Sequence, residues 1–397
     1  MKIVWLIQNL ISYHHARLEA FSARDGMEIV LIQITDQNKN GVAYRPENPA
    51  YELRTLFPGV PAAAVSYSMV ADKLQEVLEP REFDAAAICG YGMDPGVAML
   101  AFALRNRIPV VLFSETNLFD HPRKFFSEWL KRWLIKNCSA AVASGSNAAE
   151  YLRSLGMAGE AIQVGYSAVS AEHFQSNGGH QFAHPYFLCC ARMVPKKNYL
   201  RLLEAYEQYS RSVSDPWPLK IAGDGELRPA IEAAVAGKEL RGNVQLLGVL
   251  DYDELVTCYR EAGAFLLVST VEQWGLVVNE AMAAGCPVIV SSRCGCARDL
   301  VFDGENGFVV NPFSTDDIAE KMYRLGTLPP EELAAMGRRS AEIVGDWGVE
   351  RFADGLQAAV QYAVSGYRRP GLLPRLCILL DTLRRRHRSR HGGEREL

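Results

Sequence analysis

The sequence has no run of eighteen consecutive apolar residues, so it predicts no helix that crosses a bilayer. Its apolar start, M-K-I-V-W-L-I-Q-N-L, lacks the small-residue cleavage site of a signal peptide, and charged residues follow soon afterwards. We interpret this segment as the first buried strand of a domain. The 397 residues, 49% apolar and 22% charged, suffice for two globular domains of ordinary size.

Disulfide spacing and clear metal sites are lacking too. The nine cysteines are an odd number without paired spacing, which indicates a reducing cytoplasm. Cys294 and Cys296 form a C-x-C, but no second Cys or His pair accompanies them, so we prefer small residues in a tight loop over a metal site. Asp251 and Asp253 have the D-x-D form, yet D-Y-D-E-L is typical of a helix start capped by Asp. We therefore expect no metal.

Short apolar segments alternate with helical ones, which predicts parallel sheets covered by helices on both faces. We expect strands at residues 2–8, 28–34, 84–88, 109–113 and 140–143, and again at 186–190, 219–222, 244–247, 265–268, 287–290 and 307–310. The fold class is thus α/β, with two Rossmann-like, doubly wound domains. Two such domains facing each other place a ligand in a central cleft, at the carboxyl ends of the strands.

Domain boundaries follow from changes in this pattern. We expect a first domain at residues 1–168, a polar linker at 169–185, a second domain at 186–345, an amphipathic helix at 346–366 and a basic tail at 367–397. Trp347, Phe352, Leu356, Val360 and Ala363 share one face of the amphipathic helix.

The tail is charged differently from the rest of the chain. From Tyr367 onwards it carries nine Arg against three acids, a net charge of +6, whereas the remaining chain has a net charge of −10. Leu373, Leu376, Leu380 and Leu383 fall on one helical face. Such a helix could bind an anionic membrane surface, pack on the first domain, or remain a solvated tail. No RNA-binding module accompanies the arginines, so we expect no nucleic acid partner.

The segment from Val268 to Ser291, V-S-T-V-E-Q-W-G-L-V-V-N-E-A-M-A-A-G-C-P-V-I-V-S, is the most informative part of the sequence. It places Glu272 in the turn after an apolar strand and Glu280 eight residues later, on the following helix. A strand, a turn with a glycine and a helix form a phosphate site at the helix N-terminus. Acids beside a phosphate are costly unless they accept hydrogen bonds from hydroxyls, so the pattern predicts a nucleotide joined to a polyol.

Two further segments supply candidate contacts. Arg192 and Lys197 lie five residues apart after the strand at 186–190, where a forked and a compact cation can hold a diphosphate. Gly223 and Gly225 follow the strand at 219–222. They permit either close backbone approach to a nucleotide or a simple turn.

The glutamate pair, with Gly-Leu after the first Glu and the A-G-x-P-V ending, resembles the E-x7-E motif of retaining glycosyltransferases of the GT-B fold, specifically family 4. The resemblance covers most of the chain and is strongest over residues 187–313. It implies that Glu280 accepts the ribose hydroxyls and that Glu272 contacts the donor sugar. It also implies that Arg192 and Lys197 bind the pyrophosphate, that the backbone of Gly275, Leu276 and Val277 meets the phosphate, and that a C-terminal helix crosses back to the first domain.

The implied activity is retaining transfer of a sugar from a nucleoside diphosphate sugar to a glycan or lipid-linked glycan, in polysaccharide or lipopolysaccharide biosynthesis. No cofactor or metal is expected, because Arg192, Lys197 and the helix dipole can stabilise the leaving diphosphate. The expected location is the cytoplasm, at the inner face of the membrane if the tail binds there. The alternative is a non-catalytic nucleotide-sugar-binding subunit or scaffold.

The acceptor side departs from the family pattern. The Gly-rich loop that many members have after the first strand is replaced by Q-N-L-I-S-Y-H-H-A-R-L, where Tyr13, His14, His15 or Arg17 could substitute; alternatively, Ser12 caps a helix with a buried His. Many members have a His after the strand that corresponds to residues 109–113, and here Glu115 stands close by. Glu115 could contact the donor sugar or orient the acceptor, and Tyr91 and Asp94 could line the cleft. Trp274 stands where the family more often has Phe.

Overall fold

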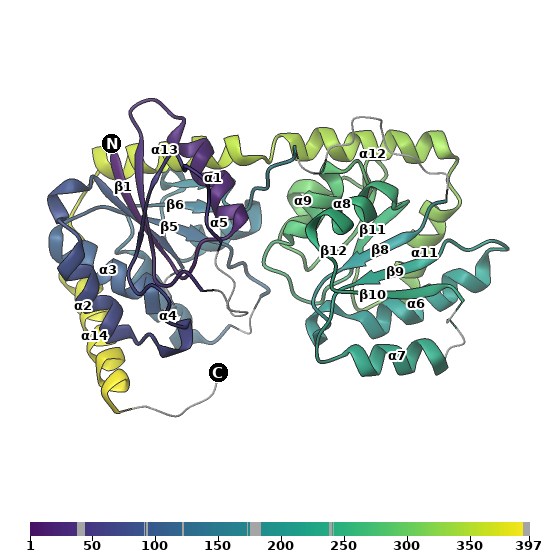
Figure 1. Ribbon diagram of the computed structural model, residues 1–397, viewed down its shortest axis with the longest axis horizontal. Coiled ribbons are helices and arrows are strands. Elements are labelled where there is room, and N and C mark those ends of the chain that lie inside the picture. Colours follow the sequence, from purple (N-terminus) through teal and green to yellow (C-terminus); the bar gives the residue numbers. More distant parts are fainter. Residues whose placement is uncertain are drawn as a thin grey trace. The chain divides into compact units, whose positions relative to one another are not determined.

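The computed structural model (Figure 1) describes residues 1–37, 44–90, 92, 94–120, 123–172, 174, 184–237, 240 and 242–391. The chain forms two compact units. Unit 1 comprises Met1–Ala168 and Val349–Leu397, and unit 2 comprises Val169–Gly348. Tyr91 and most of the predicted linker lie outside the described residues.

Unit 1 is built on a seven-stranded parallel sheet of order β3-β2-β1-β4-β5-β6-β7. Its strands are β1 (Lys2–Ile7), β2 (Glu28–Gln33), β3 (Glu52–Thr55), β4 (Ala85–Cys89), β5 (Val110–Ser114), β6 (Ala140–Ala143) and β7 (Ile162–Val164). Its helices are α1 (Ser12–Ser22), α2 (Tyr67–Val77), α3 (Asp94–Asn106), α4 (Phe125–Ile135), α5 (Ser146–Ser154), α13 (Val349–Ser365) and α14 (Leu372–His391).

Helices cover both faces of this sheet, and neighbouring residues of a strand point to opposite faces. Successive residues of each strand therefore enter two different cores. In β1, Val4 and Leu6 face a core shared with α2, α3 and α5, whereas Ile3 and Trp5 face a core shared with α1 and α13. The second core receives Phe352, Leu356, Val360 and Ala363 from α13. The C-terminal helix α13 therefore packs on the first unit, as predicted.

Unit 2 repeats the design with a six-stranded parallel sheet of order β10-β9-β8-β11-β12-β13. Its strands are β8 (Phe187–Cys190), β9 (Leu219–Ala222), β10 (Val244–Gly248), β11 (Ala264–Leu267), β12 (Val288–Ser291) and β13 (Gly307–Val310). Its helices are α6 (Tyr199–Ser212), α7 (Arg228–Gly237), α8 (Tyr252–Glu261), α9 (Leu276–Ala283), α10 (Ala297–Leu300), α11 (Thr315–Gly326) and α12 (Pro330–Gly345). Two doubly wound domains are thus confirmed.

Several local expectations need correction. The edge strands β3 and β7 were not predicted, because E-L-R-T is polar and I-Q-V has only three residues. Trp347 does not share the buried face of α13; it precedes the helix and packs in unit 2 against Trp274, with ring centroids 5.2 Å apart. Ser12 is the first residue of α1 rather than its cap, since Ile11 precedes the helix and no side chain caps it.

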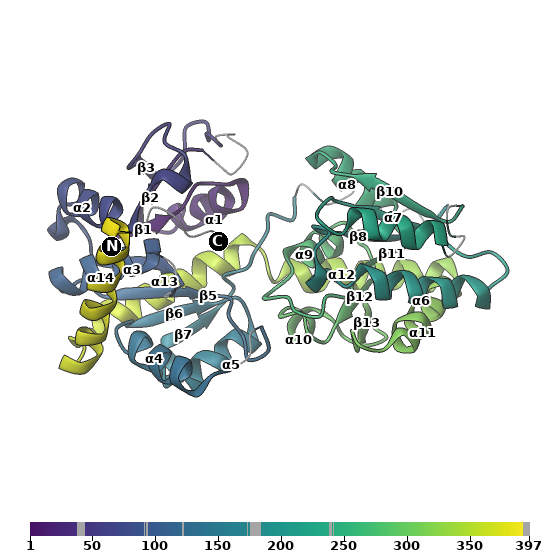
Figure 2. The same ribbon diagram turned by 90° about the horizontal axis from the view of Figure 1, so that it is seen from below.

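The tail helix α14 is docked on unit 1, beside α2, α3 and α4 (Figure 1 and Figure 2). Ile378 is buried in the core that α2 and α3 share with the sheet, and Asn137 Nδ2 donates to the carbonyl of Pro374 at 3.1 Å. Arg385 pairs with Asp94, and Arg386 with Asp72 at 2.6 Å. Of the three expectations for the tail, packing on the first domain therefore applies to the described part of it.

At the start of α1, His14 lies edge-on to Trp5, with ring centroids 5.7 Å apart. Its Nδ1 is buried without a hydrogen-bond partner. Burial, and secondarily the charge of Arg17, lower the pKa of His14 to about 3, so the ring is neutral in the folded protein.

We expect Ile378→Ala to destabilise unit 1 by about 2–4 kcal/mol, because a buried side chain leaves a cavity. The matched variant Leu380→Ala, which truncates an exposed leucine two residues away, should stay within about 0.5 kcal/mol of the wild type. Urea unfolding followed by circular dichroism measures both. Equal effects of the two substitutions would contradict the docking of α14 through Ile378.

We also expect acid to destabilise the protein through His14. Below pH 6.5 the His14 ring is protonated in the unfolded chain, whereas in the folded protein it stays neutral down to about pH 3. The free energy of unfolding therefore falls as the pH falls from 6.5 to about 3. For a partly buried ring the loss by pH 5 is at most about 2 kcal/mol. In His14→Phe the difference in unfolding free energy between pH 7.5 and pH 5 should shrink. An unchanged difference would show that His14 is not the group that titrates.

Candidate active site

The predicted donor residues gather at one edge of the unit 2 sheet. The chain adds β9 and β10 on one side of β8 and then β11, β12 and β13 on the other, so the strand order reverses between β8 and β11 although all strands stay parallel. In open parallel sheets, ligands bind at the carboxyl ends of the strands on either side of such a point. The loops that follow these two strands carry Arg192, Lys197 and Glu272.

The loop after β8 is fixed by hydrogen bonds to its neighbours. Asn198 adopts the left-handed conformation, with φ of 63°, which Asn tolerates better than most residues. Its side chain donates to the carbonyls of Val268 at 3.0 Å and Pro312 at 2.8 Å. The backbone N–H of Thr270 donates to the carbonyl of Lys196 at 2.8 Å. These bonds hold the turn Pro195–Lys197 against the end of β11.

Lys197 and Glu272 form an ion pair in which each side chain is only 13% exposed. Lys196, which is more exposed, approaches the other oxygen of Glu272 only to 4.0 Å. An ammonium group has three donor hydrogens, so the pairing with Glu272 leaves Lys197 capacity for phosphate oxygens. The side chain of Arg192 is exposed and makes no hydrogen bond or ion pair with the described residues, so its forked donors are available to an anion.

Glu280 is buried in α9, with 2% of its surface exposed. The hydroxyl of Tyr259, on α8, donates to its Oε2 at 2.9 Å. Such a donor stabilises a buried carboxylate, and the hydroxyl groups of a ligand are donors of the same kind. Sequence analysis did not find Tyr259, because it lies 21 residues from Glu280 on another helix and no local pattern marks it.

The helix α9 begins directly after Gly275, which has φ of 106° and no capping side chain. Within the described part of the chain, no acceptor meets the N–H groups of Gly275, Leu276 and Val277. Free N–H groups and the positive end of the helix dipole favour an anion at this position. The structure thus places the three backbone groups at the start of a helix, and their contact with a phosphate stays a prediction.

The two glycines after β9 are explained by backbone packing. A Cβ on Gly223 would lie 2.2 Å from the carbonyl oxygen of Ala191, and one on Gly225 would lie 2.7 Å from that of Met193. Both glycines therefore let the β9 turn lie against the loop that carries Arg192. Of the two interpretations of G-x-G, this geometry favours the turn, and it gives the glycines a role in positioning Arg192.

The loop after β12 packs against the turn that carries Glu272. The N–H of Gly295 donates to the carbonyl of Glu272 at 3.0 Å, and the N–H of Glu272 donates to that of Arg293 at 3.1 Å. Cys294 and Cys296 are fully buried, and burial raises the pKa of both thiols. Among the described residues, no three His, Cys, Asp or Glu side chains cluster as metal ligands would. Asp251 caps α8 reciprocally with Glu254, as its sequence context indicated.

Trp274, between the two glutamates, is buried rather than directed at a ligand. Its Nε1 donates to Asn279 Oδ1 at 2.9 Å, and its ring packs on Trp347. It stiffens the turn between Glu272 and Glu280. Its influence on a bound sugar is therefore indirect.

Glu115 belongs to unit 1, where it follows β5. The hydroxyl of the buried Ser167 donates to its Oε1 at 2.6 Å. Arg17 donates from Nε and Nη2 to the carbonyl of Ala168, at 3.0 and 2.9 Å, and thereby fixes the segment that carries Ser167. The Arg17 side chain is therefore already bound within the fold. The second carboxylate oxygen of Glu115 has no hydrogen-bond donor among the described residues.

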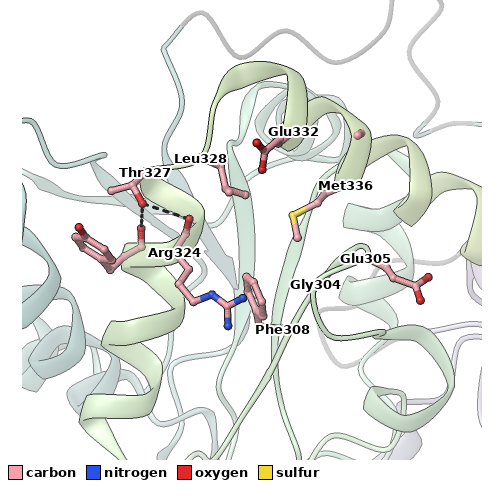
Figure 3. A pocket seen from close by; sticks show the side chains of 10 residues that line it. Gly304, Glu305, Phe308, Arg324, Thr327, Leu328, Glu332 and Met336 are labelled. Atoms are coloured by element: carbon pink, nitrogen blue, oxygen red, sulfur yellow. Dashed lines mark hydrogen bonds between the residues drawn. The ribbon is translucent and has the colours of Figure 1, made fainter.

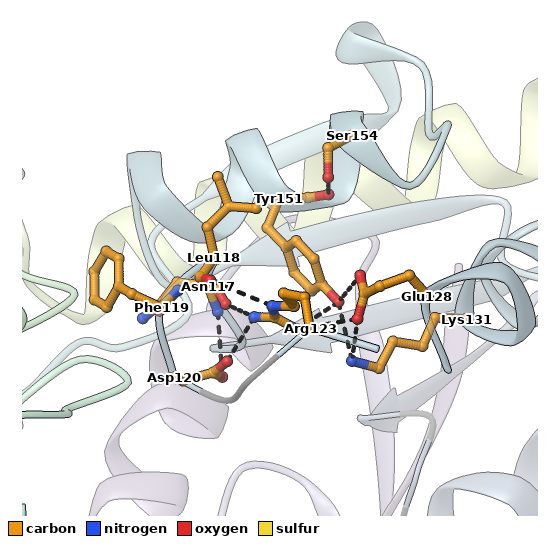
Figure 4. A network of polar contacts seen from close by, with 9 residues as sticks. All are labelled: Asn117, Leu118, Phe119, Asp120, Arg123, Glu128, Lys131, Tyr151 and Ser154. Carbon is orange, nitrogen blue, oxygen red and sulfur yellow. Dashed lines mark hydrogen bonds and ion pairs between the residues drawn. The ribbon is translucent and has the colours of Figure 1, made fainter. Parts of the chain in front are cut away.

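A polar network orders the loop after Glu115 (Figure 4). Arg123 binds Asp120 at 2.6 Å and the hydroxyl of Tyr151 at 2.7 Å, and its guanidinium lies over the Tyr151 ring at 4.2 Å. Glu128 and Lys131 complete the network around the same hydroxyl. The loop is thus tied to α4 and α5, which fixes the backbone near Glu115.

A pocket of about 560 Å³ lies elsewhere in unit 2, between β13, α11 and α12 (Figure 3). Its walls include Gly304, at the amino end of β13, and Arg324, whose guanidinium lies 4.3 Å from the centre of the Phe308 ring. None of the predicted donor residues lines it.

Comparisons with known proteins agree with this site. Residues 172–342, which include all the donor residues above, match the family described as glycosyl transferases group 1. The sulfoquinovosyl transferase SQD2 of Arabidopsis thaliana is 28% identical over 264 residues, 59% of this chain and 49% of that protein. The alpha-monoglucosyldiacylglycerol synthase of Acholeplasma laidlawii is 33% identical over 154 residues, 38% of this chain and 37% of that protein. The chain thus spans less than half of the length of these relatives.

Solved structures share the fold over nearly the whole chain. Sucrose-phosphate synthase from Thermosynechococcus elongatus has a TM-score of 0.72 and 16% identity, covering 92% of this chain and 100% of that one. HepE of Anabaena, in complex with UDP and glucose, has a TM-score of 0.66 and 17% identity, covering 90% and 98%. This likeness shows that the chain has the GT-B fold, and within it residues 172–342 match the group 1 glycosyl transferases.

Proposed function

We propose that the protein is a retaining, metal-independent glycosyltransferase that moves a sugar from a nucleoside diphosphate sugar to a glycan or lipid-linked glycan. The observation that carries the proposal is the buried carboxylate of Glu280 beside the free N–H groups at the start of α9. A buried acid that accepts a hydroxyl hydrogen bond, next to a helix start that favours an anion, suits a nucleotide ribose and its diphosphate. The structure of HepE with UDP and glucose bound supports a donor of this kind.

In this proposal each donor residue has a distinct role. Glu280 accepts hydrogen bonds from the ribose hydroxyls, and Glu272 contacts the donor sugar. Arg192 and Lys197 bind the diphosphate together with the backbone of Gly275, Leu276 and Val277. As the bond between the sugar and the phosphate breaks, negative charge grows on the leaving diphosphate, and these groups stabilise it without a metal.

The proposed reaction keeps the anomeric configuration. The acceptor oxygen attacks the anomeric carbon from the face that the diphosphate leaves, and the acceptor proton passes to a phosphate oxygen. Glu272 is an unsuitable nucleophile for double displacement, because its carboxylate is already paired with Lys197. Glu115 contacts the donor sugar or orients the acceptor hydroxyl, and Ser167 positions it.

The proposed acceptor is a glycan or a lipid-linked glycan of a polysaccharide or lipopolysaccharide pathway, met in the cytoplasm at the inner face of a membrane. The name of the sulfoquinovosyl transferase supports transferase chemistry, and the name of the alpha-monoglucosyldiacylglycerol synthase supports a lipid that carries a sugar. A non-catalytic binding subunit is the alternative, since Arg17 is bound within unit 1 and does not replace the missing glycine loop. A transfer assay separates the two.

We expect the protein to bind one nucleoside diphosphate from a panel of UDP, GDP, ADP and dTDP selectively. Glu280→Gln should weaken this binding between about 10- and 100-fold, because charged acceptors of the ribose hydroxyls are lost. Isothermal titration calorimetry measures the effect, with the exposed Glu261→Gln as matched control. A folded wild type that binds no member of the panel would refute the donor site.

We expect Glu115→Gln to lower the turnover number by about tenfold or more while donor affinity stays within about twofold, because the carboxylate acts after the donor has bound. Steady-state transfer kinetics and calorimetry give the two quantities. Glu160→Gln, an exposed acid of the same unit, is the control. Unchanged turnover would remove Glu115 from the active site.

A further inference from the structure

The tail helix α14 has two faces of opposite character. One face is packed on unit 1 through Pro374, Ile378 and Arg385, as described above. The other face is turned away from the protein and consists of leucines. Leu373, Leu376, Leu380 and Leu383, together with the flanking Leu372 and Leu379, are 39–65% exposed.

Six exposed leucines on one helix are a large apolar surface for a soluble protein domain to leave in water. They continue into a basic end of the helix, where Arg384 and Arg388 are exposed and have no partner among the described residues. On α4, which packs beside α14, Phe125 and Trp129 are exposed as well. Apolar and cationic groups thus share the outward side of α14.

We infer that the outward face of α14 binds an anionic lipid bilayer, with its leucines in the acyl boundary and Arg384 and Arg388 at the phosphate headgroups. A helix with an apolar face and an Arg-rich end lies in the plane of such an interface. The helix does not span the bilayer: within the described ranges, no helix is long and apolar enough to do so. Charge decides the class of partner, because exposed arginines beside leucines complement an acidic surface and not a neutral one.

The contacts between α14 and unit 1 hold the helix so that its leucine face points outward. Arg385 binds Asp94 and the carbonyl of Gly92, and Arg386 binds Asp72, so three groups of unit 1 hold the inward arginines. Arg385 and Arg386 are thus bound to groups of unit 1, whereas the side chains of Arg384 and Arg388 are available to bind lipid phosphates. The leucines are therefore displayed by a fixed helix rather than by an unfolded tail, and lipid binding needs little further ordering of the chain. The purpose of the contact rests on the proposed transfer to a lipid-linked acceptor.

The test is flotation of the full-length protein with vesicles in a density gradient. The wild type should float with an equimolar mixture of phosphatidylglycerol and phosphatidylcholine but not with phosphatidylcholine alone, and less at about 0.5 M salt. The triple variant Leu376→Ser, Leu380→Ser and Leu383→Ser should lose binding by more than about 100-fold. The double variant Arg384→Gln and Arg388→Gln should lose about 25-fold, or roughly fivefold for each charge.

Leu200→Ser is the matched control, because this leucine of α6 is similarly exposed but lies in unit 2. It should float like the wild type. Circular dichroism checks that the triple variant is folded, and calorimetry with the nucleotide panel should show unchanged donor binding. A failure of lipid binding is thereby distinguished from a failure of the proposed function.

Three results would overturn the inference. A folded wild type that floats with neither kind of vesicle binds no lipid. A triple variant that floats as well as the wild type places the lipid contact elsewhere on the protein. Sedimentation that shows a dimer in the wild type and a monomer in the triple variant, without flotation of either, assigns the leucine face to a second copy of the chain.

Discussion

The donor half of the protein depends on the ion pair between Lys197 and Glu272. Each side chain is mostly buried, so loss of one partner would leave an uncompensated charge, at a cost of about 3–5 kcal/mol. The pair joins the loop after β8 to the loop after β11, and the bonds of Asn198 and Gly295 add the ends of β13 and β12. Cations, carboxylates and helix N–H groups are therefore in place before a donor arrives, and little binding energy goes into ordering them.

The same pair decides what a diphosphate meets. Lys197 is neutralised by Glu272, whereas Arg192 is exposed and free, so Arg192 offers the attraction at longer range. At close range a bound phosphate would compete with Glu272 for the hydrogens of Lys197, and the free N–H groups at the start of α9 would supply additional donors. The backbone bonds of Glu272 then still hold it at the edge of the site, which leaves its second oxygen for the proposed contact with the donor sugar.

Sequence predicted the parts of this arrangement that are local. Strands buried on both faces appear as apolar runs, and Glu272, Gly275 and Glu280 fall within one strand-turn-helix segment. The missing parts come from contacts that no local pattern encodes. Tyr259 lies on another helix, the two partners Asp94 and Arg385 are 291 residues apart, and Trp347 packs on Trp274 although periodicity assigned it to the face of α13. The polar edge strand β3 was missed because it lacks the buried alternation that prediction requires.

The proposed nucleotide site and the proposed lipid-binding surface lie in different units of the chain. The proposed donor is a polar nucleotide, and the residues proposed to bind it all lie in unit 2, which has no counterpart of the leucine face among its described helices. Glu115, its positioning residue Ser167 and the helix α14 all lie in unit 1. A bilayer that binds α14 therefore fixes the acceptor unit and not the donor unit. Because α14 is docked through Ile378, Arg385 and Arg386, its orientation on a bilayer is also the orientation of β5 and Glu115. The proposed lipid-linked acceptor and the residue proposed to orient it would therefore share one rigid unit.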